Sequence, residues 1–240
     1  MCFSAKASFL ASALLLPTGT ATLAMAWAKK QRQMVPLAAA PLLFGLQQFC
    51  EGMVWLGLEG QPPPLGQPMV APVAAALAYL FFAYAFWPIW IPLAAVAQMP
   101  QAKGMEGHLW RGVPLLGLVP ALLLWLPFLQ HPSSALPTPI GHSLVYALNP
   151  WSASLLPPGV GPALYAALIV LPLLRVPSRR LHIFALTLLL TFGLSSWISR
   201  ESLTSVWCYA SALLSLQILW ILGKTEDLPE KPGSNLALRF

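Results

Sequence analysis

Charged residues are scarce in this chain: Asp, Glu, Lys and Arg together make up only 8% of its 240 residues. A soluble domain carries roughly 25% charged residues, so this chain cannot cover a water-facing surface, and we expect it in a bilayer. Hydrophobic residues, at 58%, take the place of the missing charge. The net charge of +6 comes from single basic residues and small clusters between apolar runs. No basic stripe with interleaved aromatics is present, which argues against a nucleic-acid partner.

The sequence also lacks the short motifs of the commonest enzyme classes. There is no CxxC, HExxH, GxSxG or Walker loop, and the cysteines, Cys2, Cys50 and Cys208, have no metal-finger spacing. An enzyme is therefore the less favoured class, and no cofactor is indicated. Proline, in contrast, is abundant at 25 residues, which in a membrane chain predicts kinked helices and rigid loops.

Seven apolar runs are each interpreted as a membrane-spanning helix. The sequence thus predicts an all-α, seven-transmembrane-helix bundle over residues 1–222 and a charged cytoplasmic tail over residues 223–240. We expect Pro88 and Pro92 to break the third run. The first run also has features of a secretory signal, with a cleavage pattern at residues 24–26, but we interpret it as a retained span. The runs cover residues 8–27, 36–58, 69–97, 113–129, 161–174, 181–198 and 204–222.

Basic residues are distributed unevenly about these runs. The predicted spans place all 13 Lys and Arg residues on one side of the membrane except Lys6 and Arg200. Because loops rich in Lys and Arg stay in the cytoplasm, we expect the N-terminus outside and the C-terminus in the cytoplasm. Tryptophans lie towards both ends of the spans, as expected of interfacial belts.

The second run contains the one acid that falls within a predicted span, Glu51. Gln47, Glu51 and Trp55 recur every four residues and therefore share one helix face, with Gln48 beside them. An ionisable residue at this depth is costly to insert, and it usually faces a bundle interior or a wet cavity. We expect this polar face to point inward or at a partner.

Two interpretations of Glu51 are open. In one, Glu51 has only a structural role and stabilises helix packing. It is then either protonated and hydrogen-bonded to Gln47 or ion-paired with Lys6 or Arg200. Interhelical polar contacts of this kind contribute about 0.6 kcal/mol and at most ~2 kcal/mol. In the other interpretation Glu51 is a proton or cation site, a ligand anchor or a general base, because acids within membranes are functional by default.

The predicted topology brings other reactive side chains to the outer side. His142 lies in the long connection of residues 131–160, whose middle, residues 141–148, is expected to form a short helix or a re-entrant piece. Arg200 lies in the turn before the last span, and Trp207 lies near the start of that span. With the polar face of the second run, these residues predict a ligand-binding site made of Gln47, Gln48, Glu51, Trp55, His142, Arg200 and Trp207.

Two cysteines, Cys2 and Cys208, also fall on the outer side. With His142 they would supply sulfur and imidazole ligands, which suit zinc or copper. No ligand spacing supports a metal, so a disulfide between the two cysteines, or two buried free thiols, are the favoured alternatives.

Four segments carry recognisable motifs. These are MCFSA-x-ASF at residues 1–9, PLLFG-x-QQ-x-x-EG-x-x-W at 41–55, FWP-x-W-x-P at 86–92 and SVWC at 205–208. His142 and Tyr146 are similar to an H-x-x-Y pair, with the tyrosine one position late. The whole chain thereby resembles an uncharacterised family of bacterial multi-helix membrane proteins. The resemblance implies a shared seven-helix architecture, but no activity, substrate or cofactor.

These observations predict a multi-pass protein of a bacterial inner or thylakoid-type membrane, with the lipid bilayer as its partner. We expect an outward-facing site, centred on Glu51, that binds or translocates a small ligand or ion. One alternative is an accessory or structural subunit of a larger membrane complex, with other membrane subunits as partners. Another is an intramembrane metal-dependent hydrolase using Cys2, His142, Cys208 and Glu51, although four histidines are few for such an enzyme.

Overall fold

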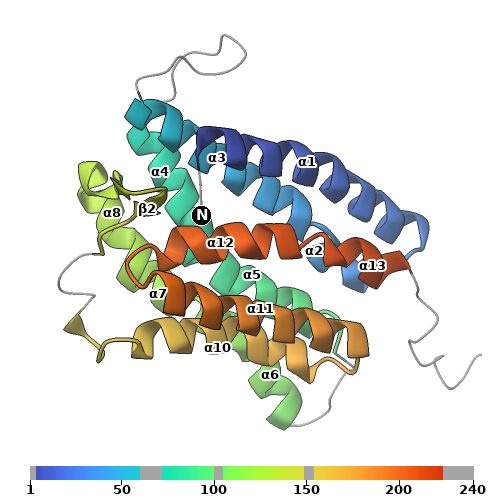
Figure 1. The fold of residues 1–240 in the computed structure, drawn as a ribbon. Helices are drawn as coiled ribbons and strands as arrows, with labels where there is room; N and C mark the ends of the chain where they lie inside the picture. Colours follow the sequence, from blue (N-terminus) through green and yellow to red (C-terminus); the bar gives the residue numbers. More distant parts are fainter. Residues whose placement is uncertain (1–3, 60–71, 100–104, 149–153, 224–240) are drawn as a thin grey trace, which may run out of the picture.

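The computed structural model describes residues 4–59, 72–99, 105–148 and 154–223, and about 81% of these residues are helical. The long helices lie side by side in one bundle (Figure 1). Within the described residues, six helical stretches are long and apolar enough to cross a membrane, as expected of a membrane protein. They are Ala5–Ala28, Arg32–Glu59, Pro72–Val96, Met105–Gln130, Arg179–Ile198 and Leu203–Gly223.

Short breaks in helical geometry divide several of these stretches into named elements. The first half of the chain contains α1 (Ala5–Ala28), η1 (Arg32–Met34), α2 (Val35–Ala38), α3 (Ala40–Glu59), α4 (Pro72–Leu80), η3 (Phe81–Phe86) and α5 (Trp87–Val96). The middle contains α6 (Met105–Leu116), α7 (Leu118–Pro120), η4 (Ala121–Trp125), α8 (Leu126–Gln130), η5 (Pro132–Ala135), β1 (Thr138–Ile140) and β2 (Ser143–Val145). The last part contains α10 (Val160–Arg175), α11 (Arg179–Ile198), α12 (Leu203–Leu214) and α13 (Gln217–Gly223).

The largest difference between a predicted span and its helix is at the fourth span, whereas the fifth agrees with its helix but is short. The fourth begins at Met105 rather than at residue 113, because Glu106 lies in the first turn, where an acid stabilises a helix N-terminus. The predicted span at residues 161–174 is the helix α10, which has 16 residues and is shorter than the six candidate spans. The tail of residues 224–240 lies outside the described residues.

The long connection after α8 contains a β-hairpin, so the short helix expected as one alternative for residues 141–148 was wrong. The strands β1 and β2 pair antiparallel, with Ile140 opposite Ser143. Gly141 has φ 60°, a left-handed conformation that suits the first position of a two-residue hairpin turn. The hairpin is also an exception to the predicted all-α fold.

Close contact between α1 and α3 depends on glycine. A Cβ atom added to Gly19 would lie 2.1 Å from the backbone nitrogen of Leu42, and one added to Gly52 would lie 2.8 Å from the Phe9 ring. Small residues allow helix backbones to approach closely where no water drives association. Thr22 on α1 also forms a hydrogen bond to α2, because its hydroxyl donates to the Ala38 carbonyl at 2.7 Å.

Prolines shape the third candidate span without breaking it, contrary to expectation. The helix continues from Pro72 to Val96, and its π-helical segment η3 ends just before Pro88. In π-helical register, residue 88 would donate an N–H to the Ala83 carbonyl, which proline cannot do. The Tyr165 hydroxyl of α10 donates to that carbonyl instead. The proline therefore frees an acceptor that joins two helices.

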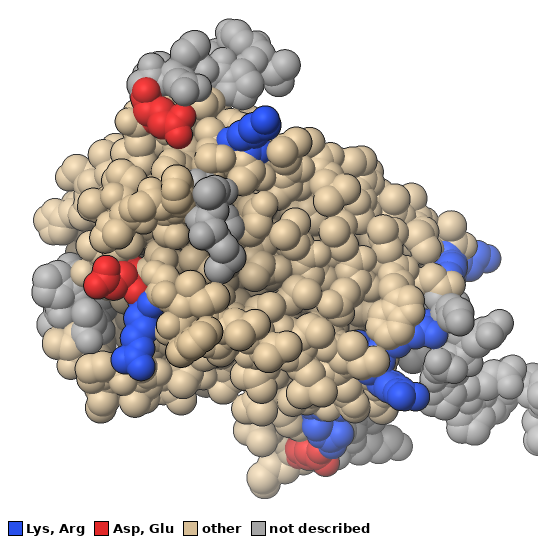
Figure 2. Space-filling model, viewed as in Figure 1, with Lys and Arg blue, Asp and Glu red and all other residues tan. Residues whose placement is uncertain are grey.

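On the face shown in Figure 2, charged side chains gather towards the ends of the bundle and the surface between them is apolar. Lys and Arg concentrate at the end where α1 and α13 finish and α11 begins. The basic side chains described there are Lys29, Lys30, Arg32, Arg175, Arg179 and Arg180. Lys6 and Arg200 lie near the opposite end, with Glu59 and Glu201.

Substitution of Gly19 by alanine tests the close packing of α1 on α3. The added methyl group meets backbone atoms, which cannot move aside as a flexible side chain can, so Gly19→Ala is expected to destabilise the protein by about 1–3 kcal/mol. Thermal unfolding in detergent measures the change. The matched control is Gly193→Ala on α11, where a Cβ atom meets nothing within 4 Å, and where alanine should leave the unfolding temperature unchanged or slightly higher. Equal effects of the two substitutions would contradict the packing argument.

Candidate functional site

The predicted polar face of α3 lies inside the protein. Gln47 and Gln48 are fully buried, Glu51 is 1% exposed and Trp55 is 6% exposed. Gly45 and Gly52 flank these residues and let α1 approach α3 closely, against Leu16 and Phe9. The helix period that puts Gln47, Glu51 and Trp55 on one face therefore sets a carboxyl group among buried amides and an indole.

Glu51 is held by a serine from the other end of the chain. The Ser205 hydroxyl of α12 donates to the Glu51 Oε1 atom at 2.6 Å, and both side chains are buried. Lys6 and Arg200, proposed from the sequence as ion-pair partners, are exposed. Gln47, proposed as a hydrogen-bond partner, is engaged elsewhere. Ser205 was not among the predicted site residues, although it lies within the SVWC segment, because a serine near a helix start has no distinctive sequence signal.

Gln47 is anchored to the third candidate span. Its Oε1 atom accepts a hydrogen bond of 2.7 Å from the Trp87 indole N–H. The Trp87 ring stacks on Phe44, with 3.9 Å between ring centroids. One half of the Gln47 amide thus stabilises the packing of α3 on α5, while its Nε2 atom has no partner.

Two tyrosines hold the start of α12 against the helix pair α4 and η3. The Tyr84 hydroxyl and the Thr204 Oγ1 atom are 2.9 Å apart, and the Tyr79 hydroxyl donates to the Thr204 carbonyl at 3.4 Å. These contacts fix the residue directly before Ser205. The position of the hydroxyl that reaches Glu51 is therefore set by side chains from α4 and η3.

Tyr146 enters the site from the connection that follows the hairpin. Its ring stacks on Tyr79, with centroids 5.2 Å apart. Burial raises the pKa of the Tyr146 phenol well above its ordinary value, and the nearby Glu51 carboxyl raises it further. The phenol therefore stays protonated at neutral pH and retains its donor.

Unpartnered polar atoms concentrate around Glu51. Among the described residues, nine buried side-chain nitrogen or oxygen atoms have no hydrogen-bond partner. Six of the nine belong to this region: Ser8 Oγ, Gln47 Nε2, Gln48 Nε2, Gln48 Oε1, Trp55 Nε1 and Tyr146 OH. Native proteins pair the large majority of such atoms, so a cluster of them requires an explanation.

The other residues of the predicted site lie elsewhere. His142 occupies the hairpin turn and is exposed, as is Arg200. Trp207 is buried, but its indole N–H donates to the Leu188 carbonyl at 3.3 Å, and its ring contacts Tyr165 and Phe192. The structure thus brings together Gln47, Gln48, Glu51 and Trp55. His142 and Arg200 are exposed, and the indole N–H of Trp207 is engaged by α11.

The thiols give no metal centre in the described part of the chain. Cys208 is a buried free thiol and therefore forms no disulfide, and Cys50 is also free. No group of three His, Cys, Asp or Glu side chains that could hold a metal occurs among the described residues. Cys2, which the metal and disulfide alternatives both require, lies outside those residues.

Comparison with known proteins identifies a family but no activity. No curated protein and no solved structure matches the chain. A family model described as a family of unknown function, DUF6629, matches residues 1–231. The match covers every described residue from the start of α1 to the end of α13. The chain therefore belongs to the DUF6629 family.

Proposed function

We propose that this chain is a seven-span protein of a bacterial inner or thylakoid-type membrane, with its N-terminus outside and its C-terminus in the cytoplasm. Besides the six candidate spans, the helix α10 would supply the remaining crossing. It packs beside α5 and α11 and runs between the two ends of the bundle (Figure 1). Its 16 residues measure about 24 Å, short of the ~30 Å hydrocarbon thickness. Local thinning of the bilayer accommodates such a mismatch at modest cost.

We further propose that the buried cluster around Glu51 binds a small polar ligand or ion from the outer side. Each buried polar group left without a partner costs about 1–3 kcal/mol. One such group is already a sizeable fraction of the stability of a typical protein, about 5–15 kcal/mol. A polar occupant that pairs with these atoms accounts for their retention, and this concentration of unpaired groups is the observation that carries the proposal.

The types of unpaired atoms favour a molecule over a bare cation. The indole N–H of Trp55 and the two amide nitrogens can only donate hydrogen bonds. A metal cation or proton would satisfy the Glu51 carboxyl and the Gln48 oxygen but would leave these donors unpaired. A small zwitterion offers a cationic group to Glu51 and acceptor oxygens to the donors. Glu51 precedes the end of α3 by eight residues, about 12 Å along the helix, so the site lies within reach of the outer surface.

Two alternatives have weaker support. An accessory role in a larger membrane complex would appear as copurification with other subunits at fixed stoichiometry. A metal-dependent hydrolase would need His142 and Cys208 at the level of Glu51, and His142 is exposed in the hairpin turn whereas Cys208 is buried. We therefore do not carry the hydrolase forward.

The number of crossings can be tested by single-cysteine accessibility. In a chain whose natural cysteines are replaced by alanine, Lys6→Cys, Lys30→Cys and Arg200→Cys each supply one exposed thiol. Seven spans predict that an impermeant maleimide labels positions 6 and 200 on intact cells, and labels position 30 only after lysis. If α10 does not cross, α11 runs in the opposite direction and position 200 is labelled only after lysis. Arg200→Cys is therefore the discriminating variant.

Opposite stability effects are expected at the two adjacent glutamines. The Gln48 amide lies near the Glu51 carboxyl, but neither of its atoms has a protein partner with hydrogen-bond geometry. Gln48→Leu should therefore raise the free energy of unfolding by about 1–2 kcal/mol while removing ligand contacts. Gln47→Leu is the matched control, because it leaves the Trp87 N–H buried without an acceptor and should lower stability by about 1–3 kcal/mol. Chemical denaturation in detergent measures both. Destabilisation by Gln48→Leu as large as that by Gln47→Leu would show that the Gln48 amide serves packing only.

Glu51→Gln should weaken ligand binding while it keeps an oxygen to accept from Ser205. The test measures the thermal stabilisation of the purified protein by zwitterions such as glycine, proline and glycine betaine, and by Na⁺ and K⁺ alone. We expect stabilisation by a zwitterion, with an affinity weakened at least tenfold in Glu51→Gln, the loss of about 1.5 kcal/mol that one charged hydrogen bond contributes. Glu59→Gln, an exposed acid at the end of the same helix, is the control and should bind normally. Equal binding by Glu51→Gln would contradict the proposal, and stabilisation by the bare cations alone would contradict the preference for a zwitterion over an ion.

A further inference from the structure

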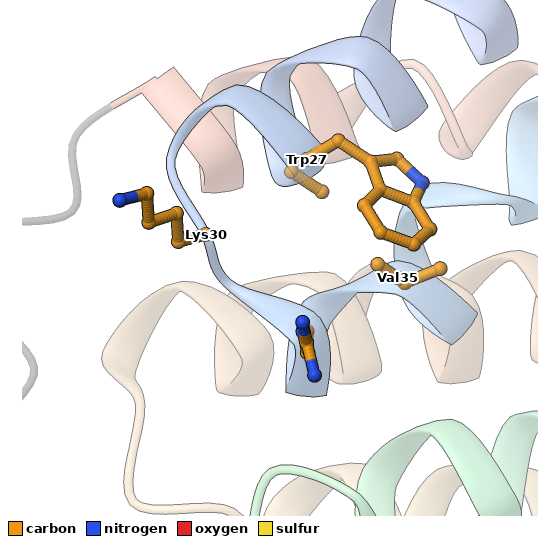
Figure 3. A pocket seen from close by; sticks show the side chains of 5 residues that line it. Trp27, Lys30 and Val35 are labelled. Atoms are coloured by element: carbon orange, nitrogen blue, oxygen red, sulfur yellow. The ribbon is translucent and has the colours of Figure 1, made fainter.

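We propose that a cleft at the basic end of α1 binds the headgroup phosphate of an anionic phospholipid. The cleft has a volume of about 370 Å³ and is lined by Ala26, Trp27, Lys30, Arg32 and Val35 (Figure 3). It lies where the first candidate span, Ala5–Ala28, ends. This site is separate from the Glu51 cluster and does not depend on the function proposed there.

The turn that forms the cleft places a lysine where glycine is favoured. The Gln31 N–H donates to the Ala26 carbonyl at 2.9 Å, and the Lys30 N–H donates to the Trp27 carbonyl at 2.9 Å. This pair of bonds is the Schellman motif, whose left-handed residue is usually glycine. Here that residue is Lys30, with φ 55°. A residue other than glycine that is kept in this strained backbone conformation is a reason to look for a function.

Most of the other basic side chains at this end, Arg179 apart, have partners within the described part of the chain. Lys29 donates to the Leu222 carbonyl at 2.6 Å, and Arg175 pairs with Glu106. Arg180 donates to the Ile221 carbonyl at 3.3 Å and lies over the Trp220 ring. The side chains of Lys30 and Arg32 form no hydrogen bond or ion pair with any described residue. Two unpaired cations on one cleft attract a phosphate group.

The apolar part of the cleft favours a lipid over a free phosphate. Trp27 is 62% exposed, and its ring lies close to Val35 across the turn, while the Lys30 amino group extends away at the rim (Figure 3). An exposed indole at the end of a membrane helix is typical of the interface, where its apolar body contacts acyl chains. Basic clefts between membrane helices bind anionic lipid headgroups in this way. The combination of an indole wall and two cations fits one lipid molecule.

Phosphatidylglycerol binding to purified protein in neutral detergent tests the proposal, with native mass spectrometry as the readout. Each lost charge should weaken phosphatidylglycerol binding about fivefold, so the double variant Lys30→Gln/Arg32→Gln should bind it about 25-fold more weakly. Phosphatidylcholine binding should not change. The control Arg111→Gln/Arg179→Gln removes the same charge from exposed positions outside the cleft and should bind within twofold of the unmodified chain.

Three outcomes would overturn the proposal: equal loss of binding in the control, equal binding of the two lipids, or displacement of the lipid by millimolar inorganic phosphate. The first would indicate diffuse surface attraction, and the last would indicate a site for a free anion.

A second variant separates a structural role of Lys30 from lipid binding. Lys30→Gly keeps the left-handed backbone conformation but removes its steric strain, so it should raise the unfolding temperature. The same variant should weaken phosphatidylglycerol binding about fivefold, because it removes one charge. If the variant is more stable and binds the lipid as well as the unmodified chain, Lys30 has no part in the site and the proposal fails.

Discussion

The hydrogen bond from Ser205 to Glu51 is the contact around which the buried polar region of this protein is built. It joins α3 to α12 across 154 residues of chain. A carboxyl group buried in an apolar bundle must be hydrogen-bonded, because the cost of leaving it unpaired is several kilocalories per mole. The need for a hydrogen-bond partner therefore places α12 beside α3, where Ser205 reaches Glu51. On another side, the glycines of α3 allow α1 to approach closely.

Proline has a constructive role in the same arrangement. Pro88 lies just after the π-helical segment η3, and the carbonyl of Ala83 that it cannot pair is taken by Tyr165 of α10. The aromatic residues of η3 and its neighbours then hold the start of α12 through Tyr84 and Thr204. A residue that would destabilise an isolated helix therefore supplies an acceptor for a neighbouring one. The short helix α10 is tied to the bundle by this contact.

The two ends of the bundle differ in the charged and polar groups that they carry and in how these groups are paired. At the basic end, Lys29 and Arg180 donate to the last carbonyls of α13, which a helix leaves unpaired and partly negative. Their charge is thus used within the fold, and Lys30 and Arg32 keep theirs available. The opposite end carries few charges, and the polar groups near it are buried around Glu51. The described basic side chains are thus concentrated at one end of the bundle, whereas the buried polar groups around Glu51 lie towards the other.

Local patterns in the sequence were sufficient to predict most of the helical segments and one side of the site. The helix over residues 40–59 and the shared face of Gln47, Glu51 and Trp55 follow from the helical period, which depends only on neighbours in the chain. Hydropathy likewise predicted the apolar stretches, because the bilayer solvent acts on each stretch separately. The exact count of crossings was not decided in this way, since α10 is shorter than a standard span.

Partners distant in the chain were decided only by the tertiary structure. No local pattern relates Ser205 to Glu51 or Trp87 to Gln47, because these contacts depend on how whole helices pack. His142 appeared from its position to belong to the outer site, but Gly141 turns the chain into a hairpin and leaves the histidine exposed. Tyr146, a few residues later, is buried against Tyr79 instead. The sequence by itself determined which helix carries the acid, since helical period and hydropathy are local; the folded chain decided which side chains reach it, since that depends on packing between distant segments.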